Sequence, residues 1–213
     1  MVSTPYHHGA LRDVLLAEGR KLLMEEGPQA VTLRGLAKRA GVSHSAPVRH
    51  FRDRDALLDA IAAEGFEELV AALDAAQHHT SLRAQLSGYA SAHVRFALEN
   101  APLMELMFSS VSHAGDSPAA HAASRFFVQG AAMLGEDGNG RPGVLPYLLA
   151  GTLEGISSLA STGRLARDQV DEVTAAAVEL LLPAIQEQLN SRHLEANRIK
   201  PAYSQPQKAD GAC

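Results

Sequence analysis

Apolar residues recur every three or four positions along most of this chain, a spacing typical of amphipathic helices. Besides two short helices within residues 32–53, the pattern predicts helices over about residues 9–26, 53–77, 82–99, 103–111, 119–134, 144–162 and 168–190. Glycine and proline separate several of them, as at Gly27-Pro28 and in the loop 135–143. The chain is therefore expected to be all-α, with about nine helices. Gly19 lies inside the first helix, which predicts the close approach of a neighbouring helix.

Residues 32–57, TLRGLAKRAGVSHSAPVRHFRDRDAL, have the pattern of two short helices joined by a tight turn. Thr32 is placed to cap the first helix, whose apolar stripe is Leu33, Leu36, Ala37 and Ala40. Gly41 stands where that helix would end in a left-handed residue, and Ser43 is placed to cap the next helix. The arrangement predicts a helix-turn-helix, whose second helix can enter the major groove of DNA.

Composition agrees with a globular, helical protein, since 46% of the residues are apolar, 20% are charged and 5% are aromatic. We find no run of about 18 apolar residues that would span a membrane. The start of the chain, MVSTPYHHGALRD, lacks the apolar core of a signal peptide. The only cysteine is Cys213, so an intrachain disulfide cannot form. These features favour a cytoplasmic protein without a membrane partner.

The net charge of −5 is unevenly distributed. Residues 1–55 hold nine Lys and Arg against six Asp and Glu, a net charge of +3. The remaining residues hold ten Lys and Arg against eighteen Asp and Glu, a net charge of −8. A positive end on a negative body would orient the molecule toward phosphates, which modestly supports binding to nucleic acid.

The pattern divides the chain into three parts. Residues 1–53 are expected to form a helix-turn-helix domain, and residues 54–190 a larger helical body for ligand binding and dimerisation. Residues 191–213 are polar and contain Pro201 and Pro206, so they are expected to be a disordered tail. Pro183 is expected to kink or shorten the last helix.

The run that begins at Thr32 resembles the DNA-binding signature of the tetracycline-repressor (TetR) family of bacterial regulators. The matching elements are Leu36-Ala37, Ala40-Gly41-Val42-Ser43, His50-Phe51 and Arg54-Asp55-Ala56-Leu57. The resemblance extends back through EEGPQAVTLR (25–34) and YHHGALR (6–12), so it covers about the first 60 residues. Because several fixed offsets agree at once, this signal is stronger than any single short motif.

The opening YHHG and the GIxxLxxxGRL pattern of residues 155–165 also resemble one subgroup of the family. In that subgroup the penultimate helix carries a Trp-x-x-x-His-Gly motif. Here Ala150 and Glu154 stand at the Trp and His positions, so this chain departs from the subgroup's pattern.

The family resemblance implies a transcriptional repressor that binds a near-palindromic operator in double-stranded DNA as a homodimer. A small-molecule effector bound in the helical body would change the spacing of the two DNA-binding heads and release the DNA. The last two helices of the body would form the dimer interface.

The candidate DNA-binding residues open the two short helices or follow them: Thr32, Arg34, Ser43, His44, Ser45, Arg49, His50 and Arg54. Serine and histidine can donate to base edges or phosphates, and arginine can bind guanine O6 and N7. By resemblance, His50 and Arg54 correspond to a phosphate-contacting pair. Val48 stands where the family usually has an aromatic residue, most often Tyr, whose hydroxyl reaches a phosphate.

The candidate ligand-binding residues are aromatic, methionine and polar side chains on the helices of the body. They are Tyr89, His93, Phe96, Met104, Met107, Phe108, Phe126, Phe127, Met133, Leu148, Thr152 and Glu154. Such residues are more often core than pocket, but the buried polar ones need partners, which a ligand can supply. Glu154 would favour a ligand with a hydrogen-bond donor or a positive charge.

The candidate dimer-interface residues lie on the last two predicted helices. Small residues on one side of residues 144–162 would allow close helix contact, and apolar residues after 168 would supply surface or core. They are Gly151, Gly155, Ser158, Leu180, Leu181 and Ile185.

Two other classes of protein remain as alternatives. A helical enzyme should show a nucleophile with its base, a phosphate loop or a metal cluster, and the sequence has none of their motifs. The ten histidines include adjacent pairs but no zinc-ligand spacing, so we expect no metal and no cofactor. A structural dimer without a ligand would be favoured if the interior proved fully packed.

Overall fold

The fold is all-α in a computed structural model that describes residues 8–76, 78–111, 115–136 and 143–199. Over these residues the chain forms eight α-helices and three 3₁₀ turns, without a strand: α1 (His8–Glu26), η1 (Pro28–Ala30), α2 (Leu33–Arg39), η2 (Pro47–Arg49), α3 (Arg54–Ala76), α4 (Leu82–Glu99), α5 (Ala101–Val111), α6 (Pro118–Met133), α7 (Val144–Ser161), η3 (Arg167–Gln169) and α8 (Val170–Ile199). The predicted fold class is confirmed. The expectations for Tyr6, His7 and residues 200–213 lie outside the described residues.

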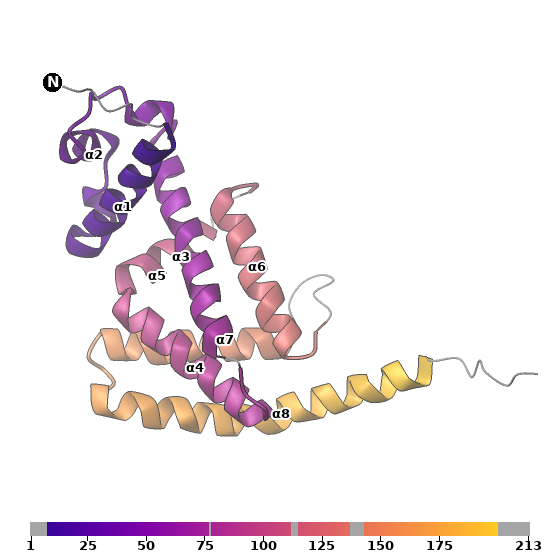
Figure 1. The fold of residues 1–213 in the computed structure, drawn as a ribbon. Coiled ribbons are helices and arrows are strands. Elements are labelled where there is room, and N and C mark those ends of the chain that lie inside the picture. The colour runs from indigo at the N-terminus through magenta and orange to yellow at the C-terminus, as the bar shows by residue number, and fades with distance from the viewer. Residues whose placement is uncertain (1–7, 77, 112–114, 137–142, 200–213) are drawn as a thin grey trace, which may run out of the picture.

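α3 connects a small N-terminal head to the helical body. In Figure 1, α1 and α2 lie at one end of α3, and α4 to α8 gather around its remaining length. α6 packs mainly along α3, whereas α7 and α8 pack against each other and against α4. α3 begins at Arg54, directly after the predicted domain boundary at residue 53, which stays a prediction.

The head is held by apolar side chains from α1, α2 and the first turns of α3. Leu15, Leu36, Phe51 and Ile61 are at most 3% exposed. A Cβ atom added at Gly19 would lie 2.9 Å from Ile61 Cδ1, so the predicted close approach of a neighbouring helix is confirmed. Because α3 contributes to this core, a shift of α3 acts directly on the packing of the head.

The second helix of the predicted helix-turn-helix is the main difference from the sequence analysis. In place of an α-helix that begins at Ser43, the chain forms turns and the single 3₁₀ turn η2. Pro47 has no N–H to donate to Ser43 in the i→i−4 pattern, and Ala46 donates to the Ser43 carbonyl instead. Arg49 and His50 likewise donate three residues back. This accounts for eight α-helices where about nine were expected.

The C-terminal helix is longer than predicted. α8 continues through Pro183 to Ile199, so residues 191–199 are helical and not the start of a disordered tail. Pro183 costs one backbone hydrogen bond, but a long helix can retain its other bonds around it. Contacts also support this end of the helix, since Arg192 donates to the Gly135 carbonyl and Gln188 Nε2 donates to the Leu134 carbonyl at 3.1 Å.

Candidate nucleic-acid interface and interior pocket

The first helix of the helix-turn-helix, α2, is capped at both ends as predicted. Thr32 Oγ1 accepts a hydrogen bond of 3.1 Å from the Gly35 amide, which caps the start of α2. Gly41 has a φ of 67°, and Gly41 and Val42 donate to the carbonyls of Lys38 and Ala37. These two hydrogen bonds form a Schellman turn, which fixes the direction in which the chain leaves α2.

We call residues 43–49 the recognition segment. Its four predicted DNA-contacting side chains, Ser43, His44, Ser45 and Arg49, are all exposed. Pro47, between them, is buried and anchors the segment to the head. The Ser43 and Ser45 hydroxyls lie 3.3 Å apart. The segment thus presents polar groups outward from a fixed backbone, although it is not an α-helix.

Cations around the recognition segment fall into two groups. Arg34, Lys38 and Arg49 are exposed and form no salt bridge within the described part of the chain. Arg39, in contrast, donates to Glu18 at 2.8 Å, which raises the pKa of Arg39 and lowers that of Glu18. The unpaired group is available to phosphates, whereas Arg39 serves the packing of α1 on α2.

The predicted phosphate-contacting pair, His50 and Arg54, is placed differently from the exposed cations. Both side chains are half-buried. Arg54 donates from Nε to the Val31 carbonyl at 2.9 Å and from Nη2 to the Pro28 carbonyl at 2.5 Å. Arg54 therefore also holds η1 and the start of α2 in place, a role that the sequence analysis did not assign to it.

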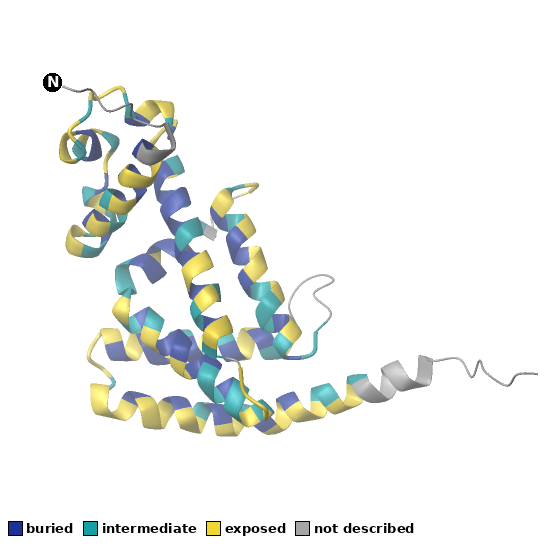
Figure 2. Cartoon of the chain, in the orientation of Figure 1, coloured by how far each residue is buried: buried dark blue, intermediate teal, exposed yellow. Residues whose placement is uncertain are grey.

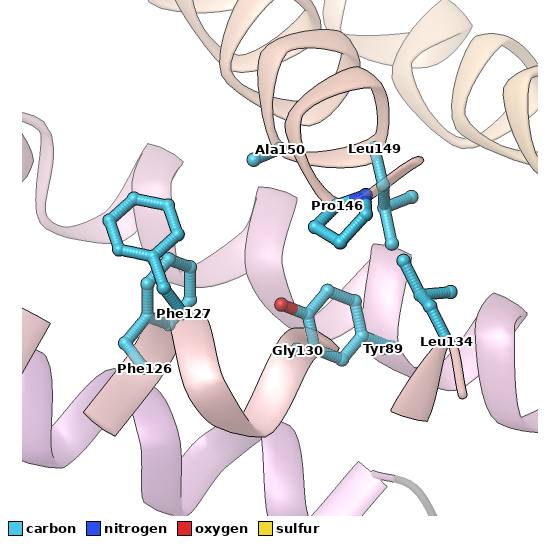
Figure 3. A pocket seen from close by; sticks show the side chains of 8 residues that line it. All are labelled: Tyr89, Phe126, Phe127, Gly130, Leu134, Pro146, Leu149 and Ala150. Atoms are coloured by element: carbon cyan, nitrogen blue, oxygen red, sulfur yellow. The ribbon is translucent and has the colours of Figure 1, made fainter. Parts of the chain in front are cut away.

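A small hollow lies between α6 and α7, with Tyr89 of α4 beside it (Figure 3). Its free volume is about 10 Å³, roughly the space of one water molecule. Eight residues line it: Tyr89, Phe126, Phe127, Gly130, Leu134, Pro146, Leu149 and Ala150. Burial raises the pKa of the Tyr89 phenol, so its hydroxyl stays protonated at neutral pH and can donate.

Three of the twelve predicted ligand-binding residues, Tyr89, Phe126 and Phe127, line this hollow. Met104 and Met107 are core residues, and the sulfur of Met107 lies 2.7 Å from a Cβ atom built at Gly65 on α3. Leu148 is 49% exposed and does not line the hollow. Four more of the predicted residues, Phe96, Phe108, Met133 and Thr152, are half-buried around the body and do not line it either.

The five lining residues that the sequence analysis missed are small or aliphatic. Helical spacing alone cannot tell such residues from ordinary core, because only the crossing of α6 and α7 brings them together. Ala150 was noted for a different reason, as the position of a missing Trp.

His93 and Glu154 form a polar pair beside the hollow. His93 is 1% exposed, and its Nε2 lies 2.9 Å from Glu154 Oε1. Its other ring nitrogen, Nδ1, is buried and has no hydrogen-bond partner within the described residues. Glu154 is half-buried, so it lies neither free in solvent nor fully inside the core. The structure thus joins two of the predicted polar ligand-binding residues.

The predicted dimer-interface residues separate into surface and core. Gly151, Gly155 and Ser158 are exposed on α7, and Leu180 on α8 is 81% exposed. Leu181 is half-buried. Ile185 is 1% exposed, so its side chain belongs to the core of its own chain and not to a surface open to a partner. Figure 2 shows exposed residues along the outer side of α8.

None of the described helices is long and apolar enough to cross a membrane. Within the described ranges, no group of three or more His, Cys, Asp or Glu side chains is placed to hold a metal ion.

The fold and the head together define a helix-turn-helix DNA-binding protein with a separate helical body. Comparison with known families identifies it further: residues 15–61 match the sequence model described as bacterial regulatory proteins, tetR family. None of the curated proteins matches the chain.

Solved structures share the fold over most of its length. A protein of unknown function from Rhodococcus sp. RHA1 is 38% identical, covers 85% of this chain and 98% of its own, and has a TM-score of 0.74. The TetR family transcriptional regulator PfmR from Thermus thermophilus is 24% identical, covering 79% of this chain and 97% of its own, with a TM-score of 0.55. A TetR variant from Acinetobacter baumannii AYE in complex with minocycline is 19% identical, covering 81% and 94%, with a TM-score of 0.57.

The chain belongs to the TetR family of transcriptional regulators. It is accordingly a DNA-binding regulator and not an enzyme.

Proposed function

We propose that this regulator is a repressor that binds a near-palindromic operator as a homodimer and leaves it when a small molecule binds in the body. The observation that carries the proposal is the recognition segment, which exposes Ser43, His44, Ser45 and Arg49 from a fixed backbone. Serine and histidine can donate to base edges, and arginine can bind guanine through two hydrogen bonds. Its place of action would be the cytoplasm, where operator DNA lies in a bacterial cell.

Contacts to the DNA backbone would come from the residues around that segment. Thr32 and Arg34 open α2 and are exposed, and His50 and Arg54 follow the recognition segment. Such contacts set the position of the head on the duplex but carry no sequence information themselves. Sequence preference is assigned to Arg49 and its neighbours instead.

The dimer would form through the exposed faces of α7 and α8. On α7, Val144 and Leu148 are exposed together with Gly151, Gly155 and Ser158, at the three- and four-residue spacing of one helix face. A Cβ atom added at Gly151 or Gly155 would have no neighbour within 4 Å in the same chain. Small residues on an open face let a second helix approach closely, and Leu180 adds apolar surface on α8. These features support a homodimer.

A path from the hollow to the head runs through α6 and α3. At the start of α6, the Ser117 hydroxyl and the Ala119 amide donate to the Asp59 carboxylate of α3, at 2.7 and 3.3 Å. Farther along, Arg125 of α6 donates to Glu67 of α3 at 2.8 Å. A ligand that moves α6 away from α7 would therefore shift α3, whose first turns pack in the head core.

The alternative that the hollow's small volume favours is a DNA-binding dimer without an effector. Ligand sites for drug-sized molecules usually hold about 300–1,000 Å³, far more than this hollow offers. Against that alternative, α6 and α7 touch at few positions, so they can separate with little loss of packing. The unpartnered nitrogen of His93 also lies beside the hollow. The related fold of the A. baumannii TetR variant does hold a small molecule, minocycline.

The proposal is tested by a mobility shift on the DNA upstream of the protein's own gene. Specific binding should weaken steeply with salt, because neutralised phosphates release their counterions. Size-exclusion chromatography with light scattering should give a dimer at micromolar concentration. A thermal-shift screen should then find a small molecule that stabilises the protein and releases the DNA. A monomer at micromolar concentration would contradict the proposed mechanism.

A further inference from the structure

Aromatic rings form most of one wall of the hollow. The Phe126 and Phe127 rings of α6 meet edge to face with centroids 5.0 Å apart, and Figure 3 shows the Tyr89 hydroxyl directed into the space between α6 and α7. Phe127 also contacts the ring of Tyr147, which is 56% exposed, at a centroid distance of 6.3 Å. The aromatic wall therefore continues from the buried Tyr89 to the molecular surface.

The polar pair continues this wall along both helices. His93 lies one turn after Tyr89 on α4, and Glu154 lies one turn after Ala150 on α7, so both extend faces that line the hollow. The His93 ring lies 6.5 Å from the Tyr89 ring and 6.3 Å from the Phe126 ring. Glu154 is thus a carboxylate held beside an aromatic cluster.

The hydrogen bond to His93 is only one of those that the Glu154 carboxylate can accept. It involves Oε1, and a carboxylate can accept about four hydrogen bonds in all. The Glu154 side chain is 36% exposed, so the group remains accessible. His93 fixes its position from the buried side, since the imidazole itself is 1% exposed.

We propose that this hollow takes an organic cation: a protonated amine or quaternary ammonium with an apolar or aromatic body, its charge held by Glu154 and its body by Tyr89, Phe126 and Phe127. This inference rests on the proposed function, because it names the ligand class of the same site. A carboxylate and the faces of aromatic rings both attract positive charge. Both repel an anion, and an uncharged ligand would cover the carboxylate without compensating its lost hydration.

Binding must open the hollow, because its free volume holds only about one water molecule. α6 is attached mainly to α3, and α7 to α4 and α8, so the seam between α6 and α7 is only weakly packed. A cation would enter this seam with its body between the aromatic residues of α6 and the apolar residues of α7.

The test compares three probes with one carbon skeleton: phenylbutylamine, phenylbutanol and phenylbutyrate, titrated calorimetrically into the full-length protein at neutral pH. The amine should bind at least about tenfold more tightly than the alcohol, and the acid should bind most weakly. An amine that binds no more tightly than the alcohol, or that does not bind, would overturn the proposal.

Two variants test whether the Glu154 carboxylate causes the preference for the amine over the alcohol. Glu154→Gln keeps an oxygen for His93 but removes the charge, so the preference for amine over alcohol should fall to within about twofold. Glu105→Gln, at an exposed position on α5, is the matched control and should leave the preference intact. An unchanged preference in Glu154→Gln would refute the assignment of Glu154.

A mobility shift with the same probes separates this inference from the proposed function. If the amine binds through Glu154 but leaves the operator complex intact, the proposed release is wrong and the ligand class stands. If the alcohol or the acid releases DNA from the protein and from Glu154→Gln equally, the release stands and the ligand class is wrong.

Discussion

Arg54 Nε donates a hydrogen bond to the carbonyl oxygen of Val31 across 2.9 Å, and so ties the start of α3 to the turn before α2. The same guanidinium also reaches the Pro28 carbonyl. Resemblance assigns Arg54 to a phosphate, but two of its donors are already used inside the head. The residue therefore also fixes the shape of the surface that is proposed to meet DNA.

Arg54→Ala should consequently weaken both folding and DNA binding. Loss of a charged donor to two backbone carbonyls should cost about 1–3 kcal/mol of unfolding free energy. In a chain of this size Tm should fall by about 2–4 °C per kcal/mol, as measured by thermal denaturation. Binding to specific and random DNA should weaken by similar factors, because no base contact is lost.

Arg34→Ala is the matched control, since Arg34 is exposed and forms no salt bridge in the described part of the chain. It should weaken DNA binding without a change in Tm. If Arg54→Ala also left Tm unchanged, its hydrogen bonds to η1 would be dispensable and its role confined to phosphate.

Arg49→Ala should change sequence preference and leave stability intact. Arg49 is exposed in η2, so its removal leaves no buried group without a partner. Loss of a bidentate contact to guanine should cost about 1–3 kcal/mol on the operator and much less on random DNA. Competitive mobility shifts with both DNAs measure the difference. Equal weakening on both would remove Arg49 from the base-reading set.

The head also shows how far sequence reasoning extends. Thr32, Gly41 and Gly19 were interpreted correctly because each depends on local geometry or a single close contact. The backbone of the recognition segment was predicted wrongly. The DNA-binding signature suggested an α-helix, but Pro47 removes an early backbone hydrogen bond and the segment forms a 3₁₀ turn. The motif predicted which side chains are exposed, but not the backbone that carries them.

In the helical body, the sequence did not predict which residues meet or which are buried, because both depend on how the helices pack together. Glu154 was noted as a polar residue in an apolar stretch, yet its partner His93 is 61 positions away and on another helix. Leu180 and Ile185 have the same helical pattern in sequence, but one is 81% exposed and the other is 1% exposed. Only the packing of α8 on α4 and α7 separates them.

Val48→Tyr should strengthen binding to all DNA sequences. Val48 is 54% exposed within the recognition segment, so a larger side chain fits without displacing core. A tyrosine hydroxyl that reaches a phosphate should add about 0.5–1.5 kcal/mol, a gain of several-fold in affinity. Val48→Phe, which lacks the hydroxyl, is the control and should give no comparable gain. Equal gains from Tyr and Phe would show that ring stacking or burial, and not a phosphate hydrogen bond, is responsible.

Gly155→Leu should separate the proposed dimer without harming the fold of each chain. A Cβ atom at this position meets nothing within 4 Å in its own chain, and leucine in place of glycine should stabilise an exposed helix by up to about 1 kcal/mol. If a second α7 packs closely here, the added side chain blocks that approach. Sedimentation or light scattering should show a shift to monomer, and operator binding should weaken because two half-sites are no longer engaged together. Ser124→Leu, at an exposed position on α6, should leave the dimer intact. A Gly155→Leu protein that remains dimeric with unchanged operator affinity would place the interface elsewhere than this face of α7.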